Sequence, residues 1–239
     1  MREILTTAEL ARVCAGDPLI VWAGQGFRPG VRAWYDGDAV AVAAPDLSKR
    51  DRLAVVGPVD SVARLAAEVF AEVGPSFRPF GDEQLIRDLA DHVPDLAFSA
   101  AFGWMDTAGL PVVTTTAAWL ESDTGVEALL TDAAPTSYAW PGRSGVRRWA
   151  AATGDSGELL SVAADAWSAP EIGFLAGVAT HPVARGKGLS RQVCAFVTAE
   201  LVKHHGRVGL MVDRDNAAAI AIYQRLGYTY RRVAAAHFQ

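Results

Sequence analysis

Residues 185–190, Arg-Gly-Lys-Gly-Leu-Ser, combine two glycines and two cations in front of an amphipathic segment. Gly186 and Gly188 let the chain expose backbone N–H groups and let an anion approach the main chain closely. A helix starting directly after them would add its free N–H groups and the positive end of its dipole. Arg185 and Lys187 add formal positive charge. The segment therefore predicts a phosphate or pyrophosphate site at the start of a helix.

The spacing differs from both common nucleotide-binding motifs. A P-loop would require glycine in place of His181 and Ser or Thr in place of Gly188. A dinucleotide-binding turn would require a third glycine where Arg191 stands. The anion site therefore belongs to another class.

Charge is unevenly distributed along this 239-residue chain, whose formal net charge is −5. Residues 181–232 hold nine Lys or Arg and three Asp or Glu, a net of +6, so the remainder carries −11. One basic region in an acidic chain suits a small polyanion better than it suits nucleic acid. A solvated basic face is the alternative interpretation of this region.

The second half of the sequence alternates strand and helix patterns. We expect strands at 146–153 and 158–167 joined by a turn, a buried strand at 172–180, and a helix over 188–205 ended by Gly206. A strand at 207–212, a helix from 213–216 to 227 and a strand at 228–238 follow. Helices between strands require parallel pairing, so the sequence predicts an α/β fold built on a mixed sheet.

The first half shows a similar alternation of strand and helix patterns but lacks the glycine-rich loop. Strand character occurs at 19–23, 31–35, 39–43, 53–56 and 95–104, and helical patterns cover 59–73 and 82–92. The turn-rich segment 106–111 is the candidate boundary. We therefore expect an N-terminal helper domain at 1–110 and a second domain at 111–239.

No stretch reaches the roughly 18 apolar residues of a membrane span. The start of the chain, Met1 to Ile4, lacks the pattern of a secretory signal. Cys14 and Cys194 lie far apart without metal-ligand spacing, which is typical of thiols in a reducing compartment. We expect a cytoplasmic protein with no bound metal and no membrane or nucleic-acid partner.

Residues 172–232 resemble the core of the GNAT superfamily, the acyl-CoA-dependent N-acetyltransferases. Two motifs in the family's order carry the likeness. The loop pattern Arg/Gln-x-x-Gly-x-Gly/Ala is filled by Arg185, Gly188 and Ser190, which departs from Gly or Ala but is small. The later pattern Asn-x-x-Ala-x-x-x-Tyr-x-x-x-Gly-Phe/Tyr is filled by Asn216, Ala219, Tyr223, Gly227 and Tyr228. The resemblance implies a GNAT fold for 111–239 and a smaller, degenerate GNAT-like domain for 1–110.

The same resemblance implies acetyl-CoA as the acyl donor, with its pyrophosphate on the loop and its pantetheine arm along 176–180. The implied cofactor-binding residues are Val178, Ala179, Thr180, Arg185, Gly186, Lys187, Gly188, Leu189, Ser190, Asn216, Ala219 and Tyr223. Asn216 could also cap the helix that it begins.

For catalysis, the family implies direct transfer of the acetyl group to an amine. The Val178 N–H is the candidate oxyanion donor, Tyr223 the candidate general acid and Glu171 the candidate general base. Tyr223 as a core aromatic and Glu171 as a surface carboxylate are the competing interpretations. His181 is expected to shape the loop.

The expected acceptor is a primary amine of a small molecule or peptide, held between the two domains of a monomer or homodimer. Tyr138, Trp140, Trp149 and Trp167 are candidate lining residues, and the acidic remainder of the chain favours a cationic amine. Two alternatives stay open. One is a non-catalytic acyl-CoA-binding sensor; the other is an acyltransferase that uses a longer acyl donor or an amino-acid acceptor.

Overall fold

A single twelve-stranded mixed sheet runs through the whole chain in the computed structural model, which describes residues 1–239. Its strand order is β1-β2-β3-β4-β5-β12-β6-β11-β10-β9-β8-β7. Only the β4–β5 and β10–β11 pairs are parallel. The predicted α/β fold with a mixed sheet is confirmed.

The two halves of the chain repeat one order of elements. The first half consists of β1 (Arg2–Ile4), α1 (Thr7–Val13), α2 (Pro18–Gly24), a 3-10 turn (Gln25–Phe27), β2 (Arg32–Asp36), β3 (Ala39–Leu47), β4 (Arg50–Val56), α3 (Val59–Val73), β5 (Arg78–Asp82), α4 (Glu83–His92) and β6 (Leu96–Thr107). The second consists of β7 (Ala118–Trp119), α5 (Val126–Ala133), β8 (Val146–Thr153), β9 (Leu159–Ala166), β10 (Gly173–Thr180), a 3-10 turn (Pro182–Ala184), α6 (Leu189–His205), β11 (Val208–Asp213), α7 (Ala217–Arg225) and β12 (Thr229–Phe238).

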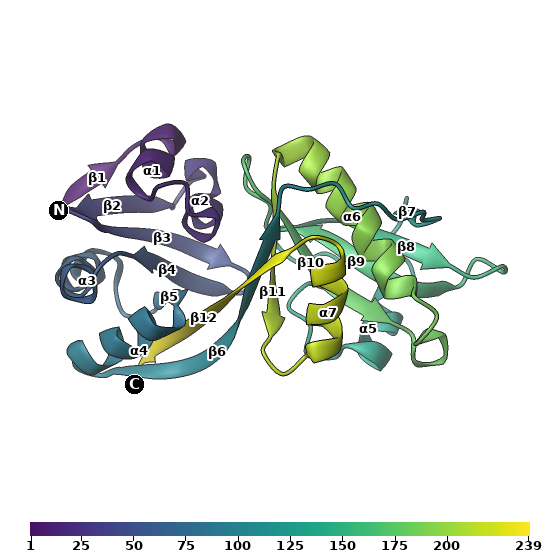
Figure 1. Cartoon of the computed structure of the whole chain (residues 1–239). Helices are drawn as coiled ribbons and strands as arrows, with labels where there is room; N and C mark the ends of the chain where they lie inside the picture. The colour runs from purple at the N-terminus through teal and green to yellow at the C-terminus, as the bar shows by residue number, and fades with distance from the viewer.

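Each half supplies the last strand of the other half's sheet. β12 lies between β5 and β6, and β6 lies between β12 and β11. Their antiparallel pairing runs from Thr229 opposite Asp106 to Phe238 opposite Leu96. Figure 1 shows these two long strands crossing between the lobes. The division of the chain at residue 110 stays a prediction, and β6, just before it, pairs only with strands of the second half, β12 and β11.

The predicted strand at 19–23 is wrong, because these residues form helix α2. The Asp17 carboxylate accepts hydrogen bonds from the N–H groups of Leu19 and Ile20, and Pro18 occupies the first turn. A short apolar run fits a buried helix as well as a strand, so the capping pair Asp17-Pro18 was the deciding signal. Strands β1, β5 and β7 and helices α1 and α5 were not predicted. None of the helices has the length and apolar character needed to span a bilayer.

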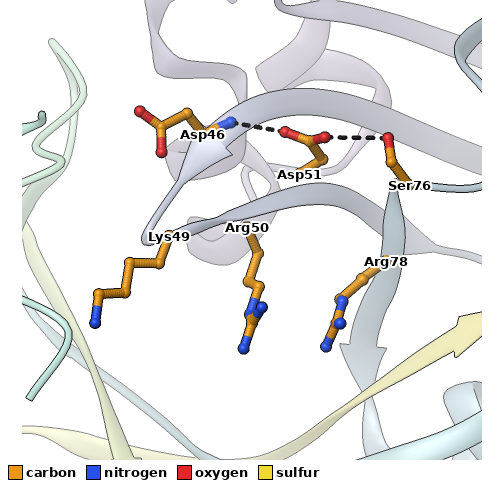
Figure 2. Close-up of a pocket in the computed structure, with 6 residues that line it drawn as sticks. All are labelled: Asp46, Lys49, Arg50, Asp51, Ser76 and Arg78. Carbon is orange, nitrogen blue, oxygen red and sulfur yellow. Dashed lines mark hydrogen bonds between the residues drawn. The ribbon is translucent and has the colours of Figure 1, made fainter. Parts of the chain in front are cut away.

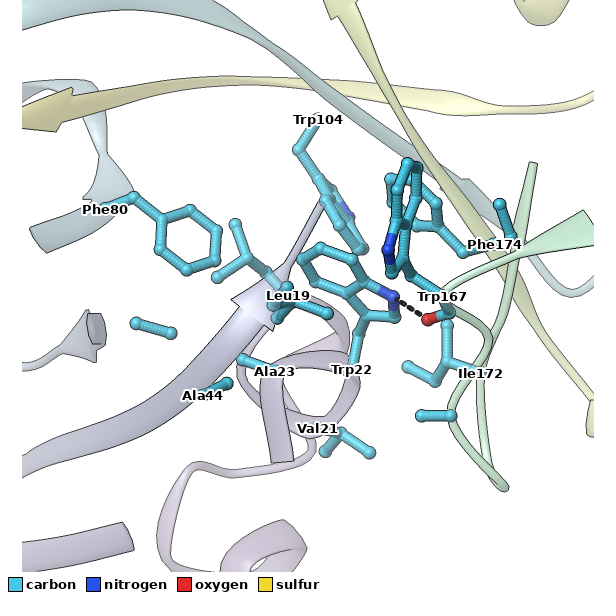
Figure 3. Packing of buried hydrophobic residues seen from close by; sticks show 14 of the residues in the cluster. Leu19, Val21, Trp22, Ala23, Ala44, Phe80, Trp104, Trp167, Ile172 and Phe174 are labelled. Atoms are coloured by element: carbon cyan, nitrogen blue, oxygen red, sulfur yellow. Dashed lines mark hydrogen bonds between the residues drawn. The ribbon is translucent and has the colours of Figure 1, made fainter. Parts of the chain in front are cut away.

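Trp22 of α2 joins the two halves through a shared core (Figure 3). Its ring stacks on Phe174 of β10 at 4.4 Å between centroids and lies 5.4 Å from the ring of Trp104. Its indole N–H donates to the carbonyl of Trp167 at 2.8 Å. Because Trp22 is fully buried, this contact fixes α2 against the start of β10.

Replacing Trp22 with alanine should lower the free energy of unfolding by about 3–5 kcal/mol, because it leaves a large cavity in the core that the two halves share. Urea unfolding followed by circular dichroism measures this loss. Trp140→Ala, at a half-buried tryptophan, is the matched control and should lower the free energy of unfolding by less. A loss below about 1 kcal/mol for Trp22→Ala would show that the halves do not depend on this contact.

Candidate functional site

The sheet opens between β10 and β11. These parallel strands pair only at Gly173 opposite Val208 and at Phe174 opposite Gly209. On its other edge β10 stays paired with β9 as far as Thr180 opposite Ser161. The second half of β10 therefore has one strand edge without a partner, which an extended ligand can use as a strand would.

A bulge in β10 marks the point of opening. Gly177 has a φ of +62°, and the register with β9 shifts between Ala176 and Ala179. A Cβ built on Gly177 would lie 2.5 Å from the ring of buried Trp149 and 3.1 Å from Ala139. Only glycine fits this position. A glycine in the middle of a strand pattern is the sequence signal for such a bulge.

The loop before α6 exposes a run of backbone donors. Gly186 and Gly188 both have a φ of +77°, with open space where a Cβ would stand. Helix α6 starts without a side-chain cap, and the N–H groups of residues 186–191 donate no hydrogen bond. The predicted helix after the glycines is confirmed. Its start therefore presents six free donors and the positive end of a seventeen-residue helix.

Unpaired positive charge is concentrated at the same place. Arg185, Lys187 and Arg191 are exposed, and none lies within ion-pair distance of a carboxylate. Five of the other six cations between residues 181 and 232 are paired with acids. These pairs are Lys203–Glu200, Arg207–Asp106, Arg214–Glu83, Arg231–Asp17 and Arg232–Glu83. The free charge of the basic region thus lies mainly at the mouth of α6.

His181 contributes to the shape of this loop. Its Nδ1 accepts a hydrogen bond from the Val183 N–H at 3.4 Å, which caps the 3-10 turn. Arg185 Nε lies 3.4 Å from the Thr180 carbonyl, and the Thr180 hydroxyl is 2.8 Å from the Ser161 hydroxyl. These contacts tie the loop to the end of β10.

Tyr223 lies buried between α7 and α6. Burial is the main cause that raises the pKa of its phenol well above the usual range, and Cys194 and Tyr228 add to it. Burial also raises the pKa of Cys194 to about 12, so the thiol beside Tyr223 carries no charge at neutral pH. Tyr228 is held by a 2.8 Å hydrogen bond to Thr198. Tyr223 therefore keeps its proton and can act only as a proton donor near neutral pH.

Asn216 caps the helix that carries Tyr223. Its side-chain oxygen accepts from the Ala219 N–H at 3.0 Å, which fixes the start of α7. Two of the five motif residues, Asn216 and Ala219, therefore have a structural role.

Glu171 is not brought together with the other candidates. It is exposed, precedes β10 and makes no hydrogen bond or ion pair. It lies two residues before β10 begins at Gly173, and Val178 lies beyond the bulge in that strand. It lies at the paired end of β10, whereas the loop follows the open end.

The four aromatic residues expected around an acceptor have separate environments. Trp149 is buried beneath Gly177, and Trp167 lines a cavity of about 200 Å³ that also includes Gln25 and Arg28 of the first half. Tyr138 is exposed, and Trp140 donates its indole N–H to Ser137.

Comparison with known proteins agrees with this fold and this loop. Residues 155–236, which contain both motifs, match the family model described as FR47-like protein. A GCN5-related N-acetyltransferase from Kribbella flavida has a similar structure, with a TM-score of 0.62 and 19% identity over 96% of this chain and 95% of that chain. A GCN5-related N-acetyltransferase from Sphaerobacter thermophilus gives a TM-score of 0.52 and 17% identity over 83% and 79%.

The chain therefore has the fold of the GCN5-related N-acetyltransferases, the GNAT fold. A mycothiol acetyltransferase from Rhodococcus erythropolis is similar over most of the sequence, with 27% identity over 95% of this chain and 72% of that protein.

The raised pKa of Tyr223 predicts that its phenol adds no tyrosinate absorbance when the folded protein is titrated to alkaline pH. Because burial keeps Tyr223 protonated, Tyr223→Phe should leave the rise in tyrosinate absorbance unchanged between pH 8 and about 11. In denaturant the same variant should lose one fifth of the signal, because the chain has five tyrosines. A loss of signal in the folded state would mean that water reaches and ionises this phenol.

Proposed function

We propose that this protein is an N-acetyltransferase that moves the acetyl group of acetyl-CoA directly to a primary amine of a small molecule or peptide. The observation that carries the proposal is the run of six free N–H groups and three unpaired cations at the mouth of α6. The GNAT fold and the FR47-like match over residues 155–236 support the reaction class. At 27% identity, the mycothiol acetyltransferase supports acetyl transfer and leaves the acceptor open.

The residues present suit coenzyme A. Gly186 and Gly188 leave space for a diphosphate against the main chain, and Arg185 and Lys187 would balance its charge. The unpaired edge of Val178–Thr180 would hold the amide-rich arm, which is the extended group that such an edge accepts. When bound, the coenzyme supplies the acetyl thioester.

Catalysis would depend first on positioning. An acyl group lying along the open edge of β10 reaches the Val178 N–H, the candidate donor to its carbonyl oxygen as negative charge develops there. Tyr223 would hold the proton that the departing sulfur needs, and its raised pKa keeps that proton in place at neutral pH. Asn216 would act indirectly by fixing the start of α7.

Glu171 is left out of this mechanism. It lies before the paired end of β10, whereas Val178 lies toward the open end, so we assign it no direct contact with the reacting amine.

Tight packing behind the bulge favours a short acyl group over a long one. The ring of Trp149 and the side chain of Ala139 fill the space directly behind Gly177. This packing supports acetyl over a longer donor. A sensor that only binds acyl-CoA would have no use for the buried proton of Tyr223, so that residue supports the enzyme over the sensor.

Tyr223→Phe should lower kcat by about 10²- to 10⁴-fold with little change in CoA affinity, because the variant removes only the proton donor. Free thiol released from acetyl-CoA, measured over a panel of amines, gives kcat, and calorimetry gives the affinity. Glu171→Gln is the matched control and should stay within about twofold of the original rate. Full activity of the Tyr223→Phe variant would show that Tyr223 is not the general acid. Binding of CoA without thiol release for any amine would favour the sensor.

A further inference from the structure

A polar cavity lies in the first half, where β3 turns into β4 beside the start of β5 (Figure 2). Its volume is about 390 Å³, and no hydrophobic residue lines it. The lining residues are Asp46, Lys49, Arg50, Asp51, Ser76 and Arg78. It lies apart from the α6 loop, which belongs to the other half.

The cations of this cavity have no carboxylate partner. None of Lys49, Arg50 and Arg78 takes part in an ion pair. Figure 2 shows the three side chains extending toward the same side, away from Asp51. The Asp51 carboxylate accepts instead from the Asp46 N–H at 3.1 Å and the Ser76 hydroxyl at 3.0 Å. The cavity therefore presents three free positive charges on one side.

A fourth cation beside them is buried. Arg52 is 6% exposed and pairs in register with Arg78 across β4 and β5. Its Nε donates to the Leu47 carbonyl at 2.9 Å, and its terminal nitrogens donate no hydrogen bond. Burial lowers the pKa of Arg52 to about 10, with Arg50 and Arg78 lowering it further and Tyr138 opposing them. A buried guanidinium without a counterion is costly, and a bound anion would offset that cost.

The backbone that presents these cations is strained. Asp46, Ser48 and Lys49 have φ values of 47°, 55° and 65°, in the left-handed region that non-glycine residues rarely adopt. The bond from Arg52 to Leu47 lies inside this turn and holds it. Strain of this kind persists where the surroundings enforce it, often at binding sites.

The second half closes one side of the cavity. Lys49 Nζ lies 3.4 Å from the Ser137 carbonyl and 5.1 Å from the centre of the Tyr138 ring. Asp46 also lines the smaller cavity that contains Arg28 and Arg147. The cationic cavity therefore lies where the two halves meet.

We propose that this cavity binds a small molecule that carries two or more oxyanion groups, carboxylate or phosphate. Arg50 and Arg78 extend in parallel and offer paired N–H donors, which suit planar or tetrahedral oxyanions. Lys49 adds a third charge at the interface, and Arg52 adds the buried one. The proposal is independent of acetyl transfer, because none of these residues belongs to the α6 loop or to α7.

The test is calorimetric titration of the full chain with citrate and with inorganic pyrophosphate at low ionic strength. The titrations use the Arg185→Gln/Lys187→Gln chain, which weakens the anion site at α6. We expect saturable binding of at least one probe near one equivalent. The better probe distinguishes carboxylate from phosphate as the preferred group.

Adding Arg50→Gln and Arg78→Gln should weaken this binding at least tenfold, which corresponds to a change of about 1.4 kcal/mol. These side chains are partly exposed, so the fold should persist, as circular dichroism would confirm. Arg225→Gln removes another exposed, unpaired arginine far along the chain and should change the affinity less than twofold. Absence of binding by both probes, or equal affinity after Arg50→Gln/Arg78→Gln, would overturn the proposal.

Discussion

The loss of pairing between β10 and β11 is the constraint on which the rest of this site depends. Main-chain N–H and C=O groups within a protein are nearly always paired, and an exception needs a partner from outside the chain. Here unpaired main-chain groups occur along the open edge of β10 and again at the uncapped start of α6. The glycines and the free cations of the loop lie at this one set of unpaired groups.

The exchange of β6 and β12 between the two halves lets β10 and β11 separate without loss of the sheet. β6 supports the far edge of β11, so β11 keeps a full antiparallel partner after it leaves β10. β12 and β6 in turn bind the two halves, and the Trp22–Phe174 stack fixes the start of β10 where its pairing with β11 still holds. The first half thus supports the site from a distance, and its own loop before α3 is only Gly57-Pro58.

Local chemistry explains which features the sequence could predict. The loop at 185–190 could be predicted because its glycines, its cations and the start of the helix follow one another along the chain. Helix α2 was misread because five apolar residues fit either element, and its cap at Asp17 was overlooked. The strand exchange could not be predicted, because it pairs Leu96 with Phe238 across most of the chain. The cationic cavity could not be predicted for a similar reason, because Arg52 and Arg78 are 26 positions apart and meet only through the pairing of β4 with β5.

Hydrogen exchange of the amides of residues 186–191, with and without saturating CoA, tests the central claim most directly. The account predicts fast exchange in the free protein, because these N–H groups donate no hydrogen bond, and at least tenfold slower exchange when CoA is bound. Amides in the middle of α6, already paired within the helix, provide the internal reference. Unchanged exchange at 186–191 with CoA bound would contradict the claim that these main-chain donors hold the coenzyme.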